Sequence, residues 1–194
     1  TNEQAIFEEL LKDLLVLTGS EYGFIGEMLY DTDGNPYLKS HAISNIAWND
    51  ETRALYEKHA PALEFRNLKS LFGAVITTGK PVISNNPATD PRRCGLPKGH
   101  PPLNAFLGLP LYSGKDMIGM VGIANRKNGY DEGVVEVLQP FLTTCSNIIT
   151  AYNVKKQARL SEEERQRAQE RYEELVNNLP VGICRSVPGD KGRF

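Results

Sequence analysis

Helical spacing of hydrophobic residues and runs of strand-forming residues separate the expected helices from the expected strands. In residues 3–17 the apolar side chains are spaced four, four and three apart, which is the spacing of one helix face. Residues 22–30 and 37–46 are rich in strand-forming side chains and flank the turn-forming segment DTDGNP. The first quarter of the chain therefore predicts a helix followed by an antiparallel hairpin.

The next segments predict two helices and a short strand. Asn49 or Asp50 can cap a helix that runs to about residue 60. A second helix is expected over residues 68–78, where it meets the helix-terminating sequence GKP. The residues VIS at 82–84 then predict a short strand.

A second hairpin is expected from residues 105–112 and 117–126, which are joined by a short Ser-Gly-Lys turn. Three glycines in these strands, Gly108, Gly119 and Gly122, leave room for neighbouring elements to approach closely. Because strands cluster rather than alternate with helices, we expect an α+β fold with a mainly antiparallel sheet and helices packed against it.

A long helix is expected to begin at Asp131 or Glu132, and its apolar residues recur at spacings of four, three, four, three and four. These residues are Val134, Leu138, Phe141, Cys145, Ile148 and Tyr152. Such a heptad-like stripe is typical of a helix that pairs along one seam, so we expect a homodimer through the first and last helices. Pro140 lies inside the stripe and predicts a kink or a later helix start.

Composition divides the chain into three parts. Residues 1–152 read as one globular domain, and residues 153–176 carry alternating blocks of basic and acidic residues with few apolar side chains. Such a segment is a marginal helix on its own in water, so we expect it to dimerise or to link domains like a coiled coil. After an Asn-Asn-Leu-Pro break, residues 177–194 begin a new segment.

Charge and cysteine content exclude several classes of function. The formal net charge is −2, which provides no bulk attraction to nucleic acid. No apolar run approaches the roughly 20 residues that a membrane span needs, and the acidic, amphipathic N-terminal stretch is no signal peptide. The chain does not begin with Met, so upstream segments, membrane spans included, stay open. Three cysteines that are far apart favour a reducing, cytoplasmic compartment.

The run NNPATDPRRCGLPKGHPPLN at residues 85–104 contains five prolines and two glycines and predicts a long loop. Long loops in compact domains are usually functional, and its cationic side chains suit a carboxylate, a phosphate or a nucleotide. The alternative is that these side chains are solvated, with His100 bonding the loop backbone. The candidate ligand-binding residues are Trp48, Arg92, Arg93, Cys94, Lys98 and His100.

Two segments in combination resemble the GAF domain, a sensor module. They are LKSLFGAVITTGKPVIS at 68–84 and FLGLPLYSGKDMIGMVGIANR at 106–126, and the resemblance covers about residues 5–152. It implies an antiparallel sheet of about six strands with helices on one face and a ligand pocket on the other, under the 85–104 loop. GAF pockets hold cyclic nucleotides, tetrapyrroles, haem, small anions or nothing known, so the cofactor stays unknown.

The rest of the chain carries a second resemblance. The charged helix resembles signalling helices that join sensors to histidine kinase or diguanylate cyclase outputs, and RYEELVNNLPVGICRSVPGDKGRF is similar to the first turn of a PAS domain. Together they imply a sensory module of bacterial signal transduction whose ligand or partner acts through a C-terminal helix. The parent protein could be attached to a membrane.

Two other functions stay open: a domain that only dimerises and spaces, and an enzyme like the free methionine sulfoxide reductases, which use this fold. The sequence shows no catalytic constellation, so we expect no enzyme in this fragment. Cys94 is followed by Gly95, whereas bilin-binding GAF domains usually show a Cys-His dipeptide, so no covalent bilin is expected. The histidines are scattered, so no metal site is expected.

Overall fold

A computed structural model describes residues 2–44, 46, 48–59, 63–96 and 98–178. The chain divides into two units, Thr1–Tyr152 and Asn153–Phe194. The first unit contains the sheet, and the described part of the second is the remainder of a long helix. The expected PAS-like start falls almost entirely on residues 179–194, which lie outside the described residues.

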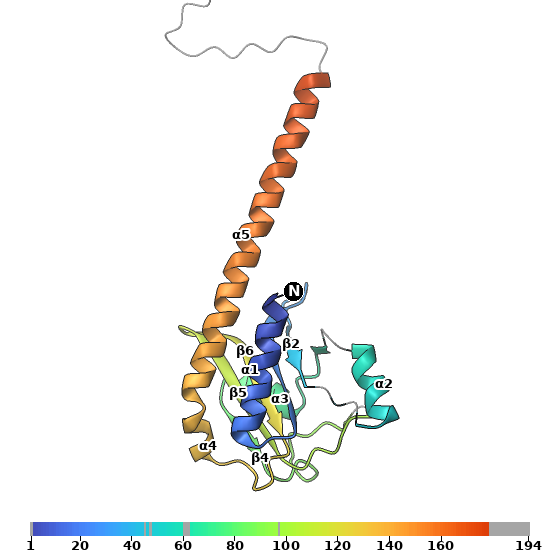
Figure 1. Ribbon diagram of the computed structural model, residues 1–194, viewed down its shortest axis with the longest axis vertical. Coiled ribbons are helices and arrows are strands. Elements are labelled where there is room, and N and C mark those ends of the chain that lie inside the picture. The colour runs from blue at the N-terminus through green and yellow to red at the C-terminus, as the bar shows by residue number, and fades with distance from the viewer. Residues whose placement is uncertain (1, 45, 47, 60–62, 97, 179–194) are drawn as a thin grey trace, which may run out of the picture. The chain divides into compact units, whose positions relative to one another are not determined.

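The first unit is built on one sheet whose strand pairs are antiparallel (Figure 1). The strands are β1 (Tyr22–Tyr30), β2 (Pro36–Ile43), β3 (Glu64–Phe65), β4 (Val82–Ser84), β5 (Phe106–Ser113) and β6 (Asp116–Ala124). Their order in the six-stranded sheet is β3-β2-β1-β6-β5-β4. The two expected hairpins, β1–β2 and β5–β6, are therefore confirmed, and β1 joins them by pairing with β6.

Helices form where the apolar periodicity predicts them. They are α1 (Asn2–Thr18), α2 (Asp50–His59), α3 (Leu71–Thr78), α4 (Glu132–Val137) and α5 (Gln139–Asn178). Helix α3 begins later than expected because Ser70 caps it: the Ser70 hydroxyl accepts the N–H of Gly73. The expected interruption near Pro140 separates α4 from α5, and Pro140 falls in the first turn of α5, where its missing N–H is tolerated. Among the described residues, no helix is both long and apolar enough to cross a membrane.

The two faces of the sheet carry side chains of different size. One face presents large aliphatic side chains, Leu107, Leu109, Leu111, Val121 and Ile123, to a core shared with α1, α4 and α5. On the other face, α3 packs through Leu71 and Val75 against Phe106 and Met120. The fold class is confirmed, and α3 adds a helix on the face that the resemblance assigned to the pocket.

Glycines allow this close packing on the second face, as the sequence predicts. A Cβ atom at Gly108 would lie 2.6 Å from a methyl group of Val75 on α3. A Cβ atom at Gly122 would lie 2.5 Å from the ring of Phe24. Both distances are shorter than a carbon–carbon contact, so side chains at these positions would push α3 and the ring off the sheet.

The structure corrects the role of the predicted seam. Leu138 and Cys145 are fully buried, and the other residues of the stripe, Val134, Phe141 and Ile148, are partly buried against the same core. Tyr152 contacts the ring of Phe7 on α1. The spacing identifies the correct helix face, but that face packs on the domain's own sheet and on α1, so this stripe is not an open dimer seam.

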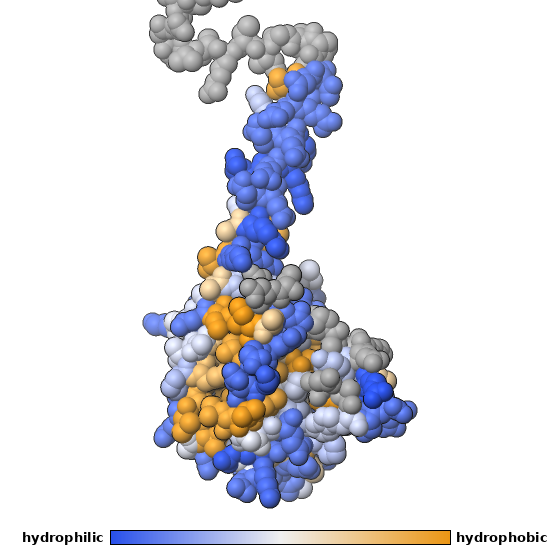
Figure 2. Space-filling view, viewed as in Figure 1, coloured by the Kyte–Doolittle hydropathy of each residue, from blue (hydrophilic) through white to orange (hydrophobic). Residues whose placement is uncertain are grey.

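Apolar side chains nevertheless remain exposed on the outer surfaces of α1 and α4. They are Ile6 at 43%, Val16 at 78%, Leu17 at 63% and Val137 at 69% exposure. Figure 2 shows a contiguous apolar surface over α1 and the neighbouring α4. The homodimer expected from the sequence stays a prediction.

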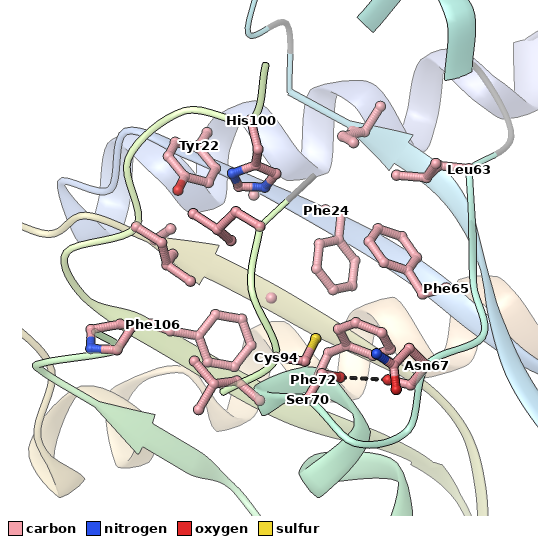
Figure 3. A pocket seen from close by; sticks show the side chains of 18 of the residues that line it. Tyr22, Phe24, Leu63, Phe65, Asn67, Ser70, Phe72, Cys94, His100 and Phe106 are labelled. Carbon is pink, nitrogen blue, oxygen red and sulfur yellow. Dashed lines mark hydrogen bonds between the residues drawn. The ribbon is translucent and has the colours of Figure 1, made fainter. Parts of the chain in front are cut away.

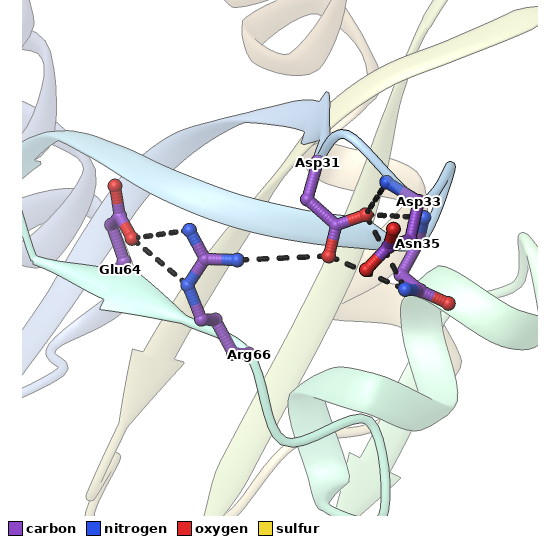
Figure 4. Close-up of polar contacts among 5 residues, drawn as sticks. All are labelled: Asp31, Asp33, Asn35, Glu64 and Arg66. Atoms are coloured by element: carbon purple, nitrogen blue, oxygen red, sulfur yellow. Dashed lines mark hydrogen bonds and ion pairs between the residues drawn. The ribbon is translucent and has the colours of Figure 1, made fainter.

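The turn between β1 and β2 is held by Asp31 and tied to the edge strand β3 (Figure 4). The Asp31 carboxylate accepts the N–H of Asp33 at 3.0 Å and that of Asn35 at 2.8 Å, and the Asn35 contact holds its pKa below the usual value. Arg66 bonds Glu64 at 2.7 Å and reaches Asp31 at 3.9 Å. This carboxylate cluster is therefore turn chemistry that fixes an edge strand.

One left-handed residue joins the loop, β1 and β6. Asn125 follows β6 with φ of 60°, the only non-glycine residue with positive φ among those described. Its side-chain oxygen accepts the N–H of Asn104 at 2.8 Å, and its amide donates to Glu21 and to the carbonyl of Pro102, both at 2.8 Å. Asn125 therefore anchors the end of the 85–104 loop.

We expect Asn125→Ala to lower the free energy of unfolding by about 2–4 kcal/mol, because it removes these bonds and leaves an alanine in a left-handed conformation. Asn125→Gly removes the same bonds without the backbone penalty and is expected to cost about 1 kcal/mol less. Urea unfolding followed by circular dichroism measures both values. Equal losses for the two variants would contradict the backbone contribution.

Candidate functional site

A cavity of about 930 Å³ lies on the α3 face of the sheet (Figure 3). Its floor is formed by β1 and β6, and its walls come from the end of β2, the β3 segment, α3 and the 85–104 loop. The aromatic side chains that line it are Tyr22, Phe24, Tyr56, Phe65, Phe72 and Phe106. A concave, mostly apolar space with few polar groups is the usual form of a small-molecule site.

Three of these rings form a continuous wall. The rings of Phe24 and Phe65 stack with centroids 4.7 Å apart, and Phe72 meets Phe65 edge to face at 5.2 Å. They come from β1, β3 and α3, three elements that the fold brings together. The wall is therefore held in place by packing among the protein's own side chains.

The 85–104 loop closes one side of the cavity, as the sequence predicts. Arg93, Cys94 and His100 line the cavity, together with Leu96 and Leu103 of the same loop. These three are the sequence-predicted site residues that the structure brings together.

His100 lines the cavity and also bonds the loop backbone. Its Nδ1–H donates to the carbonyl of Pro101 at 2.7 Å, and its ring lies edge-on to Tyr22 at 5.8 Å. Burial lowers the pKa of His100, so it is neutral at pH 7 and adds no charge to the cavity.

Arg92 serves the loop instead of the cavity. It donates to Asp90 at 2.7 Å and to the carbonyl of Ile83 on β4 at 3.0 Å. This pairing holds the pKa of Asp90 far below its ordinary value. Arg92 is therefore already bonded, and it is absent from the cavity lining.

Two further candidates also lie outside the cavity lining. Lys98 is exposed to solvent, and Trp48 is half exposed with its ring against Tyr22 at 5.7 Å. Among the sequence-predicted arginine and lysine candidates, only Arg93 lines the cavity. Arg66, which the sequence analysis did not select, also lines it. The lining is largely apolar, which differs from the anion site that the loop's charge suggests.

Sequence reasoning missed the aromatic wall. The sequence pattern favours the hydrophobic core for Phe24 and Phe72, because an aromatic residue on a strand or helix looks the same in a core and in a cavity. One usable signal is Gly122, which pairs with Phe24 on the adjacent strand β6. Because glycine has no side chain, nothing from this position of β6 covers the Phe24 ring.

The two described cysteines lie on opposite faces of the sheet. Cys94 lines the cavity, whereas Cys145 is buried in the core under α1, and burial raises the pKa of its thiol to about 12. The described residues thus place one thiol at the cavity. They also contain no group of three or more His, Cys, Asp and Glu residues that could hold a metal ion.

Comparisons with known proteins agree with this geometry. A family model described as GAF domain matches residues 1–150. The methyl sulfide methyltransferase-associated sensor of Methanosarcina acetivorans is 31% identical over 159 residues, which are 79% of this chain and 15% of that protein. The chain therefore spans about a seventh of the length of this relative.

Solved structures show the same fold at low identity. The GAF domain of a phosphoenolpyruvate-protein phosphotransferase from Coxiella burnetii has a TM-score of 0.63 at 13% identity and covers 80% of this chain and 86% of its own. A type II free methionine-R-sulfoxide reductase from Thermoplasma acidophilum has a TM-score of 0.57 at 12% identity and covers 76% and 92%.

The sheet and its helices define an α+β domain with a cavity on one face of the sheet. The matched model covers most of the first unit. The chain belongs to the GAF domain family.

The Asp90–Arg92 pair makes a pH-dependent contribution to stability. Because the folded pKa of Asp90 is depressed, the contribution is complete above the ordinary carboxyl pKa of about 3.9 and is lost as the pH falls below it. We expect Asp90→Asn to cost about 1–2 kcal/mol at pH 7 and nearly nothing at the lowest pH at which the fold survives. Thermal unfolding across that range measures the difference, and a constant difference would contradict the ion pair.

Proposed function

We propose that this domain is a sensory module that binds a small, largely apolar ligand and passes the binding event to a downstream output through α5. The observation that carries the proposal is the preformed aromatic cavity of about 930 Å³ under the loop. A homologous protein named a sensor supports the same class of function. In this reading the fragment binds and signals and is not an enzyme.

The lining suggests the chemistry of the ligand. An apolar, ring-containing body would bury its surface against Phe24, Phe65 and Phe72, at roughly 25 cal/mol for each Å² removed from water. An anionic substituent would meet Arg93, the loop cation that lines the cavity. The identity of a cofactor stays open.

A β-bulge offers a route from the cavity to the terminal helices. Ile25 pairs with Ala42 and Gly26 with Ser40, so His41 is the extra residue on β2. The bulge therefore turns both His41 and Ala42 toward the helix side, whereas Ile43 lines the cavity.

His41 then contacts both terminal helices. Its Nε2 is hydrogen-bonded to the buried Glu27 carboxylate at 3.0 Å. Its ring stacks on Phe7 of α1 with centroids 4.4 Å apart and meets Tyr152 of α5 at 5.2 Å. A ligand that displaces the end of β2 would thus move His41, which contacts both α1 and α5. Such a relay works only if the ligand binds two arrangements with different affinity.

The wider context from the sequence is part of the same proposal. We place the domain in the cytoplasm, as a homodimer, upstream of a PAS domain and a histidine kinase or diguanylate cyclase output. The support is the charged, 40-residue α5 that continues from the domain. A domain that only dimerises and spaces is the main alternative. A reductase is less supported, because the described residues supply one cavity thiol, Cys94.

The first test asks whether the cavity is occupied. We expect native mass spectrometry of the chain purified from cells, or exposed to a metabolite pool, to show an adduct. Ile43→Trp should abolish it, because the indole would fill the cavity that Ile43 lines. Tyr30→Trp is the matched control, since Tyr30 is exposed at the far end of β1 and does not line the cavity.

Retention of the adduct in Ile43→Trp would place the ligand elsewhere. The absence of any adduct, with no thermal shift across the metabolite pool, would favour the spacer function. Absorbance above about 350 nm would separately identify a conjugated chromophore.

The second test uses Ile43→Trp as a built-in occupant of the cavity. We expect it to change hydrogen exchange at least two-fold in peptides of α1 and of the first turns of α5. In a His41→Ala background that distant change should disappear while the change around the cavity persists. Transmission that is equally strong without His41 would exclude this route.

A further inference from the structure

The walls of the cavity are attached to the rest of the domain in unequal ways. Helix α3 packs on the sheet as part of a hydrophobic core. The end of the 85–104 loop is held by hydrogen bonds, because the Asn125 side chain bonds the backbone of both Asn104 and Pro102. Helix α2, which also contributes to the lining, is attached in a different manner.

The polar contacts of residues 48–59 stay inside that segment. The Asn49 N–H donates to the Thr52 hydroxyl at 3.0 Å, and the Thr52 N–H donates to the Asn49 side chain at 2.9 Å. Arg53 pairs with Asp50 at 3.8 Å. Among the described side chains of this segment, no hydrogen bond or ion pair reaches another element. Helix α2 is therefore capped from within its own segment and can move as one unit.

Helix α2 reaches the cavity through Tyr56, the described residue of this helix that lines it. Tyr56 is half-buried and packs, together with Leu103 of the loop, against a small apolar cluster. The members of that cluster are Tyr22, Ile46 and Ala124, and they also line the cavity. The cluster is separate from the two larger cores, so the contact with Tyr56 can be lost while those cores stay intact.

Tyr22 is the fixed point of this cluster. It is buried at the start of β1, and its hydroxyl donates to the carbonyl of Pro102 at 3.0 Å. Its ring meets two others edge to face, His100 of the loop at 5.8 Å and Trp48 before α2 at 5.7 Å. Figure 3 shows Tyr22 and His100 at one end of the cavity, away from Ser70 at the start of α3. The loop and the α2 segment thus meet on one ring, and the α2 segment holds it by packing alone.

We propose that α2 is a lid over this end of the cavity, latched on Tyr22 by Tyr56 and Trp48, which opens while the loop and the sheet stay in place. The inference rests on the proposed function in one respect, since it takes the cavity as the space that a ligand enters. Opening of the lid is measurable without any ligand. Trp48 does not line the cavity, so it holds the lid closed without touching a ligand.

A thiol placed under the lid measures its opening. Ala124 is 2% exposed and belongs to the cluster against which α2 packs. In a Cys94→Ser, Cys184→Ser background of the full chain, Ala124→Cys supplies that thiol, and Cys145 supplies a second one, buried in the core on the other face of the sheet. The aromatic disulfide dithiobis(nitrobenzoic acid) reacts with each thiol as it becomes accessible. Peptide mass spectrometry gives the rate at each position.

We expect Tyr56→Ala to raise the rate at position 124 about ten-fold or more, and Trp48→Ala about three-fold or more, because each substitution removes part of the latch. The rate at Cys145 should change by less than about two-fold, since the main core is untouched. Arg53→Ala is the matched control on α2, because Arg53 is exposed and does not line the cavity. It should leave both rates nearly unchanged.

Two results would overturn the lid. Equal acceleration at position 124 and at Cys145, or none from either latch substitution, would mean that α2 does not open on its own. A larger effect from Asp90→Asn, which releases Arg92 of the loop, than from Tyr56→Ala would make the loop the moving wall. Neither result depends on an adduct in native mass spectrometry, so the lid and the proposed ligand fail separately.

Trp48 supplies a second measurement that needs no added thiol, because it is the sole tryptophan of the chain. Acrylamide should quench its fluorescence more strongly in Tyr56→Ala than in the unmodified chain, since the segment that carries it leaves Tyr22 more often. Quenching in Arg53→Ala should equal that of the unmodified chain. Identical quenching in all three proteins would contradict the latch.

Discussion

The architecture depends on an unequal distribution of side-chain volume across the two faces of β1, β6 and β5. On the face covered by α1, α4 and α5, alternate residues of these strands are large aliphatic side chains. Ile25, Val121 and Leu109 lie there in one cross-strand row. The neighbouring row on the other side runs Phe24, Gly122 and Gly108. One face is therefore filled by α1, α4 and α5, whereas the other holds a ring and a helix close to the backbone and leaves space between them.

That inequality lets one sheet serve two tasks. The filled face holds α1 and the beginning of α5, and the open face leaves the cavity that the proposed function assigns to a ligand. The bulge at His41 is where β2 changes between these faces, because it places two successive side chains on the helix side. Ile43, which lines the cavity, and His41, which contacts α1 and α5, are thus close neighbours on β2.

Local patterns explain why the fold, more than the site, could be predicted. Runs of strand-forming residues joined by turn formers identify both hairpins, and the glycines correctly indicate close packing. The start of α3 differs because the decisive feature is the Ser70 cap and not the apolar Leu68 before it. The stripe from Val134 to Tyr152 has the same period whether a helix packs on its own domain or on a partner, so its partner required the tertiary structure.

The site needed contacts that no local pattern contains. Asp90 lies two residues before Arg92, but their pairing and the bond to Ile83 become visible only when the loop is placed against β4. The role of His41 depends on a pairing register between β1 and β2 that a sequence pattern does not reveal. Among the loop residues, Arg93 and Arg92 are adjacent, yet one lines the cavity and the other holds the loop.

The energetics of signalling limit how strong these contacts can be. A ligand shifts an equilibrium by no more than its difference in affinity for the two states, and such couplings are typically about 1–3 kcal/mol. The contacts of His41 with Phe7 and Tyr152 are few, so a bias of that size suffices to rearrange them. The few contacts at His41 are therefore consistent with the proposed relay, in which modest binding energy suffices to change how α1 and the beginning of α5 pack.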